Sequence, residues 1–336
     1  MISFENDYST GAHPRILETL AATNLEPAPG YGSDRFCESA AARIRAACDD
    51  ETADVFFLTG GTQTNAVVIS ALLAGHEGVI AADTGHIAVH EAGAIEATGH
   101  KVLTVPECDG KLRAADVEAY LETFYADASY THMVFPGMVF IAHPSELGTL
   151  YSLAELEELS AAATTSRCTW TVRASPMAWP LPTPTSPWPT SRASPTPSTS
   201  AAPNAERSAA RRSCSRAAAC PGTSSPTPSS TAPCWPRACA LFTDDLYGEV
   251  GRTAAAAADE LRRILREAGC TFFRESPTNQ QFVVLDNAQV EALAEGVRFS
   301  TWEKLGDGRT VIRLVTSWST TPDDLAALKA ALHEVL

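Results

Sequence analysis

The sequence predicts an α/β fold with a large domain on a mostly parallel sheet and a small C-terminal α/β domain. From residue 40 to 163, short apolar runs alternate with helical patterns of ten or more residues, which is typical of βαβ units. After residue 240 the chain shows a long helical pattern, two strand-like runs and a closing helix. Residues 164–239 fit neither pattern. We therefore expect residues 1–163 to start the large domain, 164–239 to be aberrant, and 240–336 to form the small domain.

The large domain is expected to begin with a buried strand at Asp54–Leu58, followed by a helix that starts near Thr62. Further apolar runs predict strands at Gly78–Ala82, Lys101–Val105 and His132–Ala142. Helical patterns between and after them predict helices over His90–Thr98, over Ala114–Phe124 and from Ser152 onward. In the small domain we expect helices at Thr253–Ala268 and Thr321–Leu336 and strands at Gln281–Leu285 and Thr310–Thr316.

The bulk properties exclude several classes of function. A net charge of −15 disfavours nucleic acid and anionic membranes as partners. Met1–Pro14 lacks the apolar core of a signal peptide, and no apolar run approaches the ~20 residues that span a bilayer. Outside residues 164–239 the four cysteines have no metal-ligand spacing, so we expect reduced thiols and no metal site. The expectation is a cytoplasmic protein.

Residues 164–239 have a composition unlike the rest of the chain. They hold 14 of the 22 prolines, five of the nine cysteines and four of the six tryptophans, but no lysine and a single acidic residue, Glu206. A Pro/Ser/Thr-rich tract is usually a disordered linker. The tryptophan and cysteine content instead indicates translation in a shifted reading frame.

The genetic code tests this frameshift hypothesis. When the last base of each codon is joined to the first two of the next, Trp170–Thr171 must encode aspartate, because tryptophan has only the codon TGG. Around such fixed letters the shifted frame permits VDGARL ending at Ser175, FYIGGTK ending at Asn204 and KQHGALLAKG ending at Ala238. The alternative, a genuine linker, stays open.

Two glycines separate an expected strand from an expected helix at Gly60-Gly61-Thr62. Glycines allow backbone N–H groups to approach an anion, and a helix N-terminus adds favourable partial charge. The segment therefore indicates either phosphate binding or an ordinary helix start capped by Thr62.

Three further residues are candidates for chemistry. His86 follows a strand at the edge where α/β folds bind ligands, although a histidine there is often structural. Glu91, five residues later, can orient it. Arg313 lies inside an apolar strand and needs a carboxylate partner, either a substrate or an internal Asp or Glu.

Together these motifs resemble the threonine aldolase and β-eliminating lyase family, enzymes that depend on pyridoxal 5′-phosphate (PLP) and have fold type I. The resemblance spans nearly the whole chain. It is carried by Asn6-Asp7-Tyr8-Ser9, Tyr31-Gly32-Ser33-Asp34, Gly60-Gly61-Thr62, Asp83-Thr84-Gly85-His86, Glu146–Ser152, Thr278-Asn279-Gln280, Trp302-Glu303-Lys304 and Arg313. The shifted-frame strings VDGAR and GGTK supply the family's aspartate, arginine and Schiff-base lysine.

The resemblance implies a role for each candidate residue. Gly60, Gly61 and Thr62 would hold the PLP phosphate. His86 would stack on the PLP ring and help to remove the substrate hydroxyl proton, with Glu91 assisting. Asn6 and Arg313 would bind the substrate, and Arg313 would contact the substrate carboxylate. The expected reaction is cleavage of a β-hydroxy-α-amino acid such as threonine to glycine and an aldehyde by a homodimer or homotetramer.

The chain departs from the family at its centre. As written, Thr171 stands at the aspartate position, Ala174 at the arginine position and Asn204 at the Schiff-base lysine position. We therefore expect the chain as written to be inactive. Other PLP-dependent β-elimination or aminotransferase-like chemistry remains open, as does a non-catalytic binding protein in which residues 164–239 are a real linker.

Overall fold

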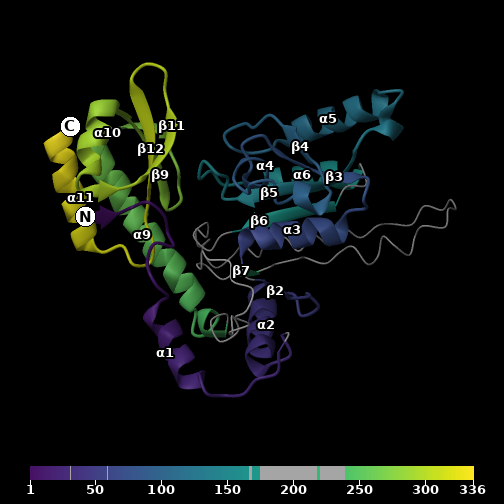
Figure 1. Ribbon diagram of the computed structural model, residues 1–336, viewed down its shortest axis with the longest axis horizontal. Helices are drawn as coiled ribbons and strands as arrows, with labels where there is room; N and C mark the ends of the chain where they lie inside the picture. Colours follow the sequence, from purple (N-terminus) through teal and green to yellow (C-terminus); the bar gives the residue numbers. More distant parts are fainter. Residues whose placement is uncertain (31, 59, 166–168, 175–217, 220–238) are drawn as a thin grey trace.

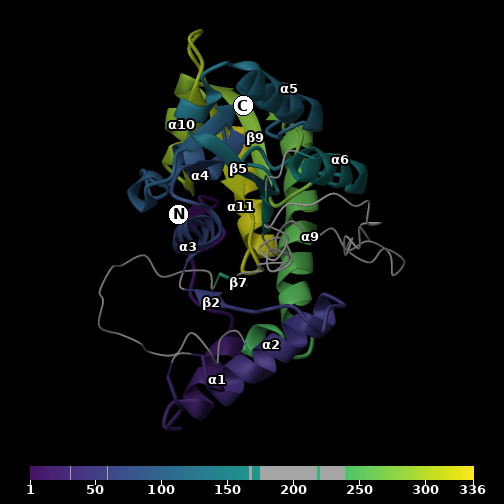
Figure 2. The ribbon, with the colours of Figure 1, turned by 90° about the vertical axis from the view of Figure 1, so that its right-hand side faces the viewer.

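The computed structural model describes residues 1–336 except 31, 59, 166–168, 175–217 and 220–238 (Figure 1). The aberrant tract predicted at 164–239 therefore lies largely outside the described residues. Figures 1 and 2 show a larger α/β part, a smaller α/β part, and the long helix α9 (Leu246–Glu267). Helix α9 runs from α1 (Pro14–Thr23) and α2 (Arg35–Ala47) to the smaller part.

The larger part is built on a parallel sheet with strand order β4-β3-β5-β6. Its strands are β3 (Glu77–Ala82), β4 (Val102–Val105), β5 (Phe135–His143) and β6 (Thr169–Ala174). Its main helices are α3 (Gly61–Leu72), α5 (Ala114–Ala126) and α6 (Leu153–Thr165). The strands predicted over Gly78–Ala82, Lys101–Val105 and His132–Ala142 are confirmed within a few residues.

Both faces of the two central strands are buried, which explains why the strands read as continuous apolar runs. Along β3, Ile80 packs in a core with residues of α5 and α6, whereas the neighbouring Val79 packs in a second core with Ile69 of α3. Strand β5 alternates in the same way, with Val139 in the first core and Met138 in the second. The helices predicted over Ala114–Phe124 and from Ser152 onward are confirmed.

Two predictions for the larger part are wrong. The helix expected over His90–Thr98 is absent; the structure instead has α4 (His86–Val89) and a 3-10 turn (Glu96–Thr98). Ala92 and Gly93 adopt φ of 50° and 75°, and this left-handed backbone interrupts a helix. The strand expected at Asp54–Leu58 shrinks to β2 (Phe57–Leu58), which pairs with β7 (Ala218–Ala219) rather than with the larger sheet.

The smaller part has an antiparallel sheet with order β11-β12-β9-β8. Its strands are β8 (Thr271–Arg274), β9 (Gln280–Asp286), β11 (Ser300–Lys304) and β12 (Arg309–Val315), and its remaining helices are α10 (Asn287–Ala294) and α11 (Pro322–Val335). Alternate residues of β9 and β12, such as Val283 and Ile312, pack against α9, α10 and α11. The predicted strands and closing helix are confirmed, while α9 begins earlier than the expected Thr253.

The N-terminal residues join the smaller part. Strand β1 (Ile2–Ser3) pairs in parallel with β10 (Val297–Arg298), and the fully buried Phe4 lies in the core of the smaller part. Between α5 and β5 lies a 3-10 turn (Tyr130–His132). In the described part of the chain, no helix has the length and apolarity needed to cross a bilayer. The predicted domain boundaries stay a prediction.

Candidate active site

His86 lies at the start of α4, just beyond the carboxyl end of β3, and forms part of a polar triad. Its Nδ1 lies 2.7 Å from Oε1 of Glu91, and Asn65 Nδ2 on α3 donates to the same oxygen at 2.6 Å. The Glu91 side chain is 0% exposed and that of His86 is 23% exposed. Because a carboxylate can only accept, Nδ1 carries the hydrogen and a neutral His86 ring has its lone pair on Nε2.

The first turns of α3 contribute Asn65 to this triad, five residues after the N-cap Gly60. Gly60 is the N-cap, no side chain of the described residues caps the helix, and Thr62 is exposed. The alternative in which Thr62 caps the helix is therefore wrong. The first N–H groups of a helix have no partner within it, so this end of α3 can bind an anion.

Arg313 lies on β12 and is held by neutral groups. Its Nη1 donates to Gln280 Oε1 and its Nη2 to Ser300 Oγ, each at 3.3 Å, and its buried Nε has no partner among the described residues. No ion pair between described residues involves Arg313. Of the two partners considered for this arginine, the internal Asp or Glu is not found in the described part of the chain.

Asn6 lies close to Arg313 in the fold. The carbonyl of Glu5 accepts from Ser300 Oγ at 2.9 Å, and Ser300 also contacts Arg313. The Asn6 side-chain oxygen accepts from Tyr8 N at 3.0 Å and Ser9 Oγ at 2.8 Å, which closes a local turn. The side-chain oxygen of Asn6 is therefore engaged by the chain itself.

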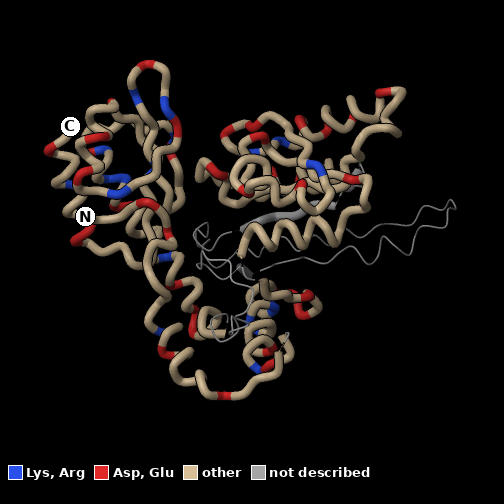
Figure 3. Tube along the Cα trace, viewed as in Figure 1, with Lys and Arg blue, Asp and Glu red and all other residues tan. Residues whose placement is uncertain are grey.

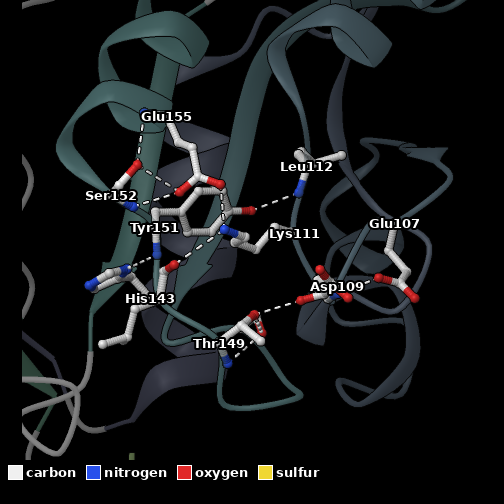
Figure 4. A network of polar contacts seen from close by, with 12 residues as sticks. Glu107, Asp109, Lys111, Leu112, His143, Thr149, Tyr151, Ser152 and Glu155 are labelled. Carbon is white, nitrogen blue, oxygen red and sulfur yellow. Dashed lines mark hydrogen bonds and ion pairs between the residues drawn. The ribbon is translucent and has the colours of Figure 1, made fainter. Parts of the chain in front are cut away.

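A second polar network, drawn in Figure 4, fixes the chain after β5. Lys111 Nζ donates to the carbonyl of Leu150 at 3.3 Å and to the Glu155 carboxylate, and the Tyr151 hydroxyl accepts from Leu112 N at 2.7 Å. Burial raises the pKa of Tyr151. This network holds the segment 144–151 against the hairpin at residues 108–111.

The segment after β5 also contacts a motif far away in the sequence. Ser276 Oγ donates to the Gly148 carbonyl at 3.0 Å and lies 2.8 Å from Thr278 Oγ1. Gly148 has φ of 73°, and a Cβ there would lie 2.3 Å from Ser276 Oγ. The motifs at 146–152 and 278–280 therefore meet where the two parts of the chain touch.

Comparison with known proteins places this geometry in a family. The family model for beta-eliminating lyase matches residues 4–169. A curated low specificity L-threonine aldolase from a Pseudomonas species is 30% identical over 161 residues, which is 47% of this chain and 45% of the relative. The solved structure of Leishmania major threonine aldolase has a TM-score of 0.79 at 30% identity and covers 99% of both chains.

The chain belongs to the beta-eliminating lyase family. The predicted resemblance to this family is thus confirmed. At the level of sequence, the match spans about half the length of the curated relatives.

The fold is confirmed as well. Besides the threonine aldolase, a serine palmitoyltransferase from Sphingomonas wittichii has a TM-score of 0.63 at 14% identity, covering 99% of this chain and 86% of that one. Likeness at this identity supports the fold alone. The predicted fold type I, with a mostly parallel sheet in the larger part and a small C-terminal α/β part, is therefore confirmed.

In this beta-eliminating lyase chain, Thr171 and Ala174, which are predicted to stand where the family has its aspartate and arginine, fall on β6. Ile80 of β3 pairs with Val139 of β5, which pairs with Trp170, so Thr171 lies one residue beyond this level toward the carboxyl end. Ala174 ends β6 beside His143. Their side chains, and Asn204 altogether, lie outside the described residues.

None of the four lysines of the chain contacts the triad. Lys101 and Lys304 are exposed, Lys111 pairs with Glu155, and Lys329 Nζ lies 2.9 Å from Glu267 Oε2. All four belong to the described part of the chain. The structure therefore places no lysine of the chain at the triad.

Two residues of this site are not among the candidates predicted from the sequence. Asn65 is one, and its side chain binds Glu91. His90 is the other; its ring lies 5.7 Å from that of His86 and 6.1 Å from that of Trp302. The spacing of His86 and His90, four residues apart across a short helix, is a signal that could have suggested the contact.

Proposed function

We propose that this chain derives from a PLP-dependent lyase that cleaves a β-hydroxy-α-amino acid, such as threonine or allo-threonine, into glycine and an aldehyde. The observation that carries the proposal is the His86–Glu91–Asn65 triad beside the uncapped start of α3. Arg313, for which the described residues offer no carboxylate partner, supports it. The substrate and the PLP dependence follow the threonine aldolases that this chain resembles.

The non-covalent contacts expected for PLP fit the residues present. Gly60 and Gly61 offer backbone N–H groups at a helix start with no side-chain cap. Glu91 Oε2 and Thr84 Oγ1 are buried without a hydrogen-bond partner in the described chain, so both atoms are available to hydrogen-bond a ligand or water. Bound PLP supplies an electron sink for the negative charge that develops at the substrate Cα.

The protein's own residues then have distinct tasks. Arg313 binds the substrate carboxylate, and a guanidinium matches it with two parallel hydrogen bonds. Nε2 of His86 takes the proton of the substrate hydroxyl as the Cα–Cβ bond breaks, while Glu91 holds the ring and stabilises its protonated form. Asn65 keeps Glu91 in place.

The covalent contact does not fit the chain as written. Asn204 stands at the lysine position and Thr171 at the aspartate position. We therefore propose that the chain as written binds PLP weakly and does not turn over, and that a compensated frameshift across residues 164–239 accounts for this. The restored protein is proposed to be a cytoplasmic homodimer or homotetramer.

Two steps test the proposal. The gene is first resequenced across codons 150 to 250 for single-base changes that restore VDGAR and GGTK. The chain as written and the frame-restored chain are then assayed with threonine and allo-threonine for acetaldehyde and glycine. A restored chain whose lysine at position 204 is replaced by alanine is the control.

The outcomes separate the alternatives. Acetaldehyde with glycine from the restored chain, but not from the control or the chain as written, supports the proposal. Pyruvate or another 2-oxo acid would indicate β-elimination instead. If the published bases stand and the restored chain releases no product, the binding-protein alternative with a real linker replaces the lyase.

A further inference from the structure

We propose that Trp302 is a positioning residue. It orients the guanidinium of Arg313 and, through its contact with His90, sets the distance between that guanidinium and His86. The inference rests on the proposed function, because it assigns the substrate carboxylate to Arg313. It adds a residue from the smaller part that touches neither reacting bond.

The first step is the face of the small sheet on which Arg313 lies. Arg313 pairs directly with Ser300 of β11 and with Phe282 of β9. Side chains directly opposite each other across an antiparallel pair lie on the same face. The neighbouring Val283, Ile312 and Leu314 pack on the helices, so the side chain of Arg313 lies on the opposite face of the sheet.

The second step is an irregularity in β11. The register between β11 and β12 shifts between Thr301 and Glu303, so that Trp302 is the extra residue of a β-bulge. Bulges bend a strand and redirect side chains, and they are frequent beside active sites. The Trp302 ring packs edge-on against the fully buried Phe282, with centroids 5.1 Å apart and an interplanar angle of 77°. This contact fixes its orientation.

The third step is the contact between Trp302 and Arg313. Cζ of Arg313 lies 5.6 Å from the centroid of the Trp302 ring, within the range of a cation–π interaction. The other two contacts of the guanidinium, to Gln280 and Ser300, are long hydrogen bonds of 3.3 Å to neutral groups. The aromatic ring therefore holds the guanidinium without neutralising it, and the charge remains for an incoming carboxylate.

The fourth step joins the two parts of the chain. The His90 ring lies 6.1 Å from the Trp302 ring and 5.7 Å from the His86 ring. A row of side chains thus runs from His86 through His90 and Trp302 to Arg313. The proposed base, His86, belongs to the larger part, and the carboxylate-binding Arg313 belongs to the smaller part. This row of side chains therefore sets the distance between the two groups that a bound substrate must contact.

The experiment measures glycine binding by isothermal titration calorimetry, on the chain as written and on the frame-restored chain. The variants are Trp302→Ala, Trp302→Phe and Arg313→Ala. Trp318→Ala is the matched control, because the Trp318 ring also packs at a tilt against a histidine, His13, with centroids 5.0 Å apart. Circular dichroism and thermal melting check that each variant folds.

Trp302→Ala is expected to weaken glycine binding about five- to tenfold, the size of a partly desolvated cation–π contact. Trp302→Phe keeps a ring and is expected to stay within about twofold, and Trp318→Ala should bind like the parent. In the frame-restored chain, Trp302→Ala should raise KM for threonine by a similar factor and change kcat less than about twofold.

Two results overturn the inference alone. One is a Trp302→Ala variant that binds glycine as the parent does while Arg313→Ala loses binding. The other is a Trp302→Phe variant as weak as Trp302→Ala, since that would make the indole a volume filler. If Arg313→Ala itself binds normally, the carboxylate role in the proposed function is wrong, and the inference fails with it.

Discussion

Replacing Glu91 with glutamine tests the triad with the smallest change of shape. In the structure one oxygen, Oε1, accepts from both Asn65 and His86, and the other, Oε2, is buried without a partner in the described chain. In Glu91→Gln the amide oxygen can occupy the position of Oε1 and keep both contacts. The amide NH2 then takes the place of Oε2, a buried position at which the described residues make no hydrogen bond to the carboxylate.

Two free-energy terms follow from this geometry. Hydrogen bonds to a charged group contribute about 1.5–3 kcal/mol and neutral ones about 0.5–1.5 kcal/mol, so His86 loses about 1–1.5 kcal/mol of support for its protonated form. Since about 1.4 kcal/mol corresponds to a factor of ten, kcat should fall about tenfold. The buried amide hydrogens should in addition destabilise the fold by about 1–3 kcal/mol.

The assay is threonine cleavage by the frame-restored chain at saturating substrate, with urea unfolding of the same samples to separate stability from catalysis. Glu118→Gln, on the exposed side of α5, is the control for removal of one negative charge. A Glu91→Gln variant that keeps kcat within about twofold of the parent would refute the argument that Glu91 supports a charged His86.

Three further predictions concern the fold. Gly148→Ala should lower the free energy of unfolding, measured by urea titration, by about 1–3 kcal/mol, because φ at Gly148 is 73° and a Cβ there would clash with Ser276 Oγ. Gly11→Ala is the control and should change this free energy little, because no atom lies within 4 Å of a Cβ built at Gly11. Burial, with Lys111 nearby, lowers the pKa of His143 in the folded chain, so the unfolded chain takes up a proton first as the pH falls. The free energy of unfolding should therefore decrease as the pH drops below about 6.5. His143→Gln should make this decrease smaller in melting curves recorded at different pH values. Phe4→Ala should cost about 3–5 kcal/mol by the same unfolding assay, because Phe4 is fully buried in the smaller core.

Much of the fold could be predicted because buried parallel strands leave a clear mark. Runs such as Gly78–Ala82 are apolar at every position, since both faces are covered by helices. The failures have local causes. The segment His90–Thr98 has a helical composition, but Ala92 and Gly93 adopt left-handed φ. Among the described residues the short β2 pairs with β7, and β7 belongs to the tract at 164–239, whose sequence gives no strand signal.

The site was harder to predict because its members come from distant segments. His86 and Glu91 are five residues apart, so their contact could be foreseen from spacing. Asn65 reaches Glu91 across 26 residues, and Trp302 reaches His90 only because the two parts of the chain face each other. The roles assigned to Asn6 and Thr62 stay predictions.

The pairing of β1 with β10 has a consequence for how the N-terminus folds during translation. Ile2 and Ser3 find their partners, Val297 and Arg298, only after residues 164–239 have been translated. A product that ended inside that tract would leave Phe4 without most of the core that buries it. In the proposed frameshift, a second shift that restores the frame before residue 240 therefore decides whether β1 and Phe4 have the smaller part to fold against.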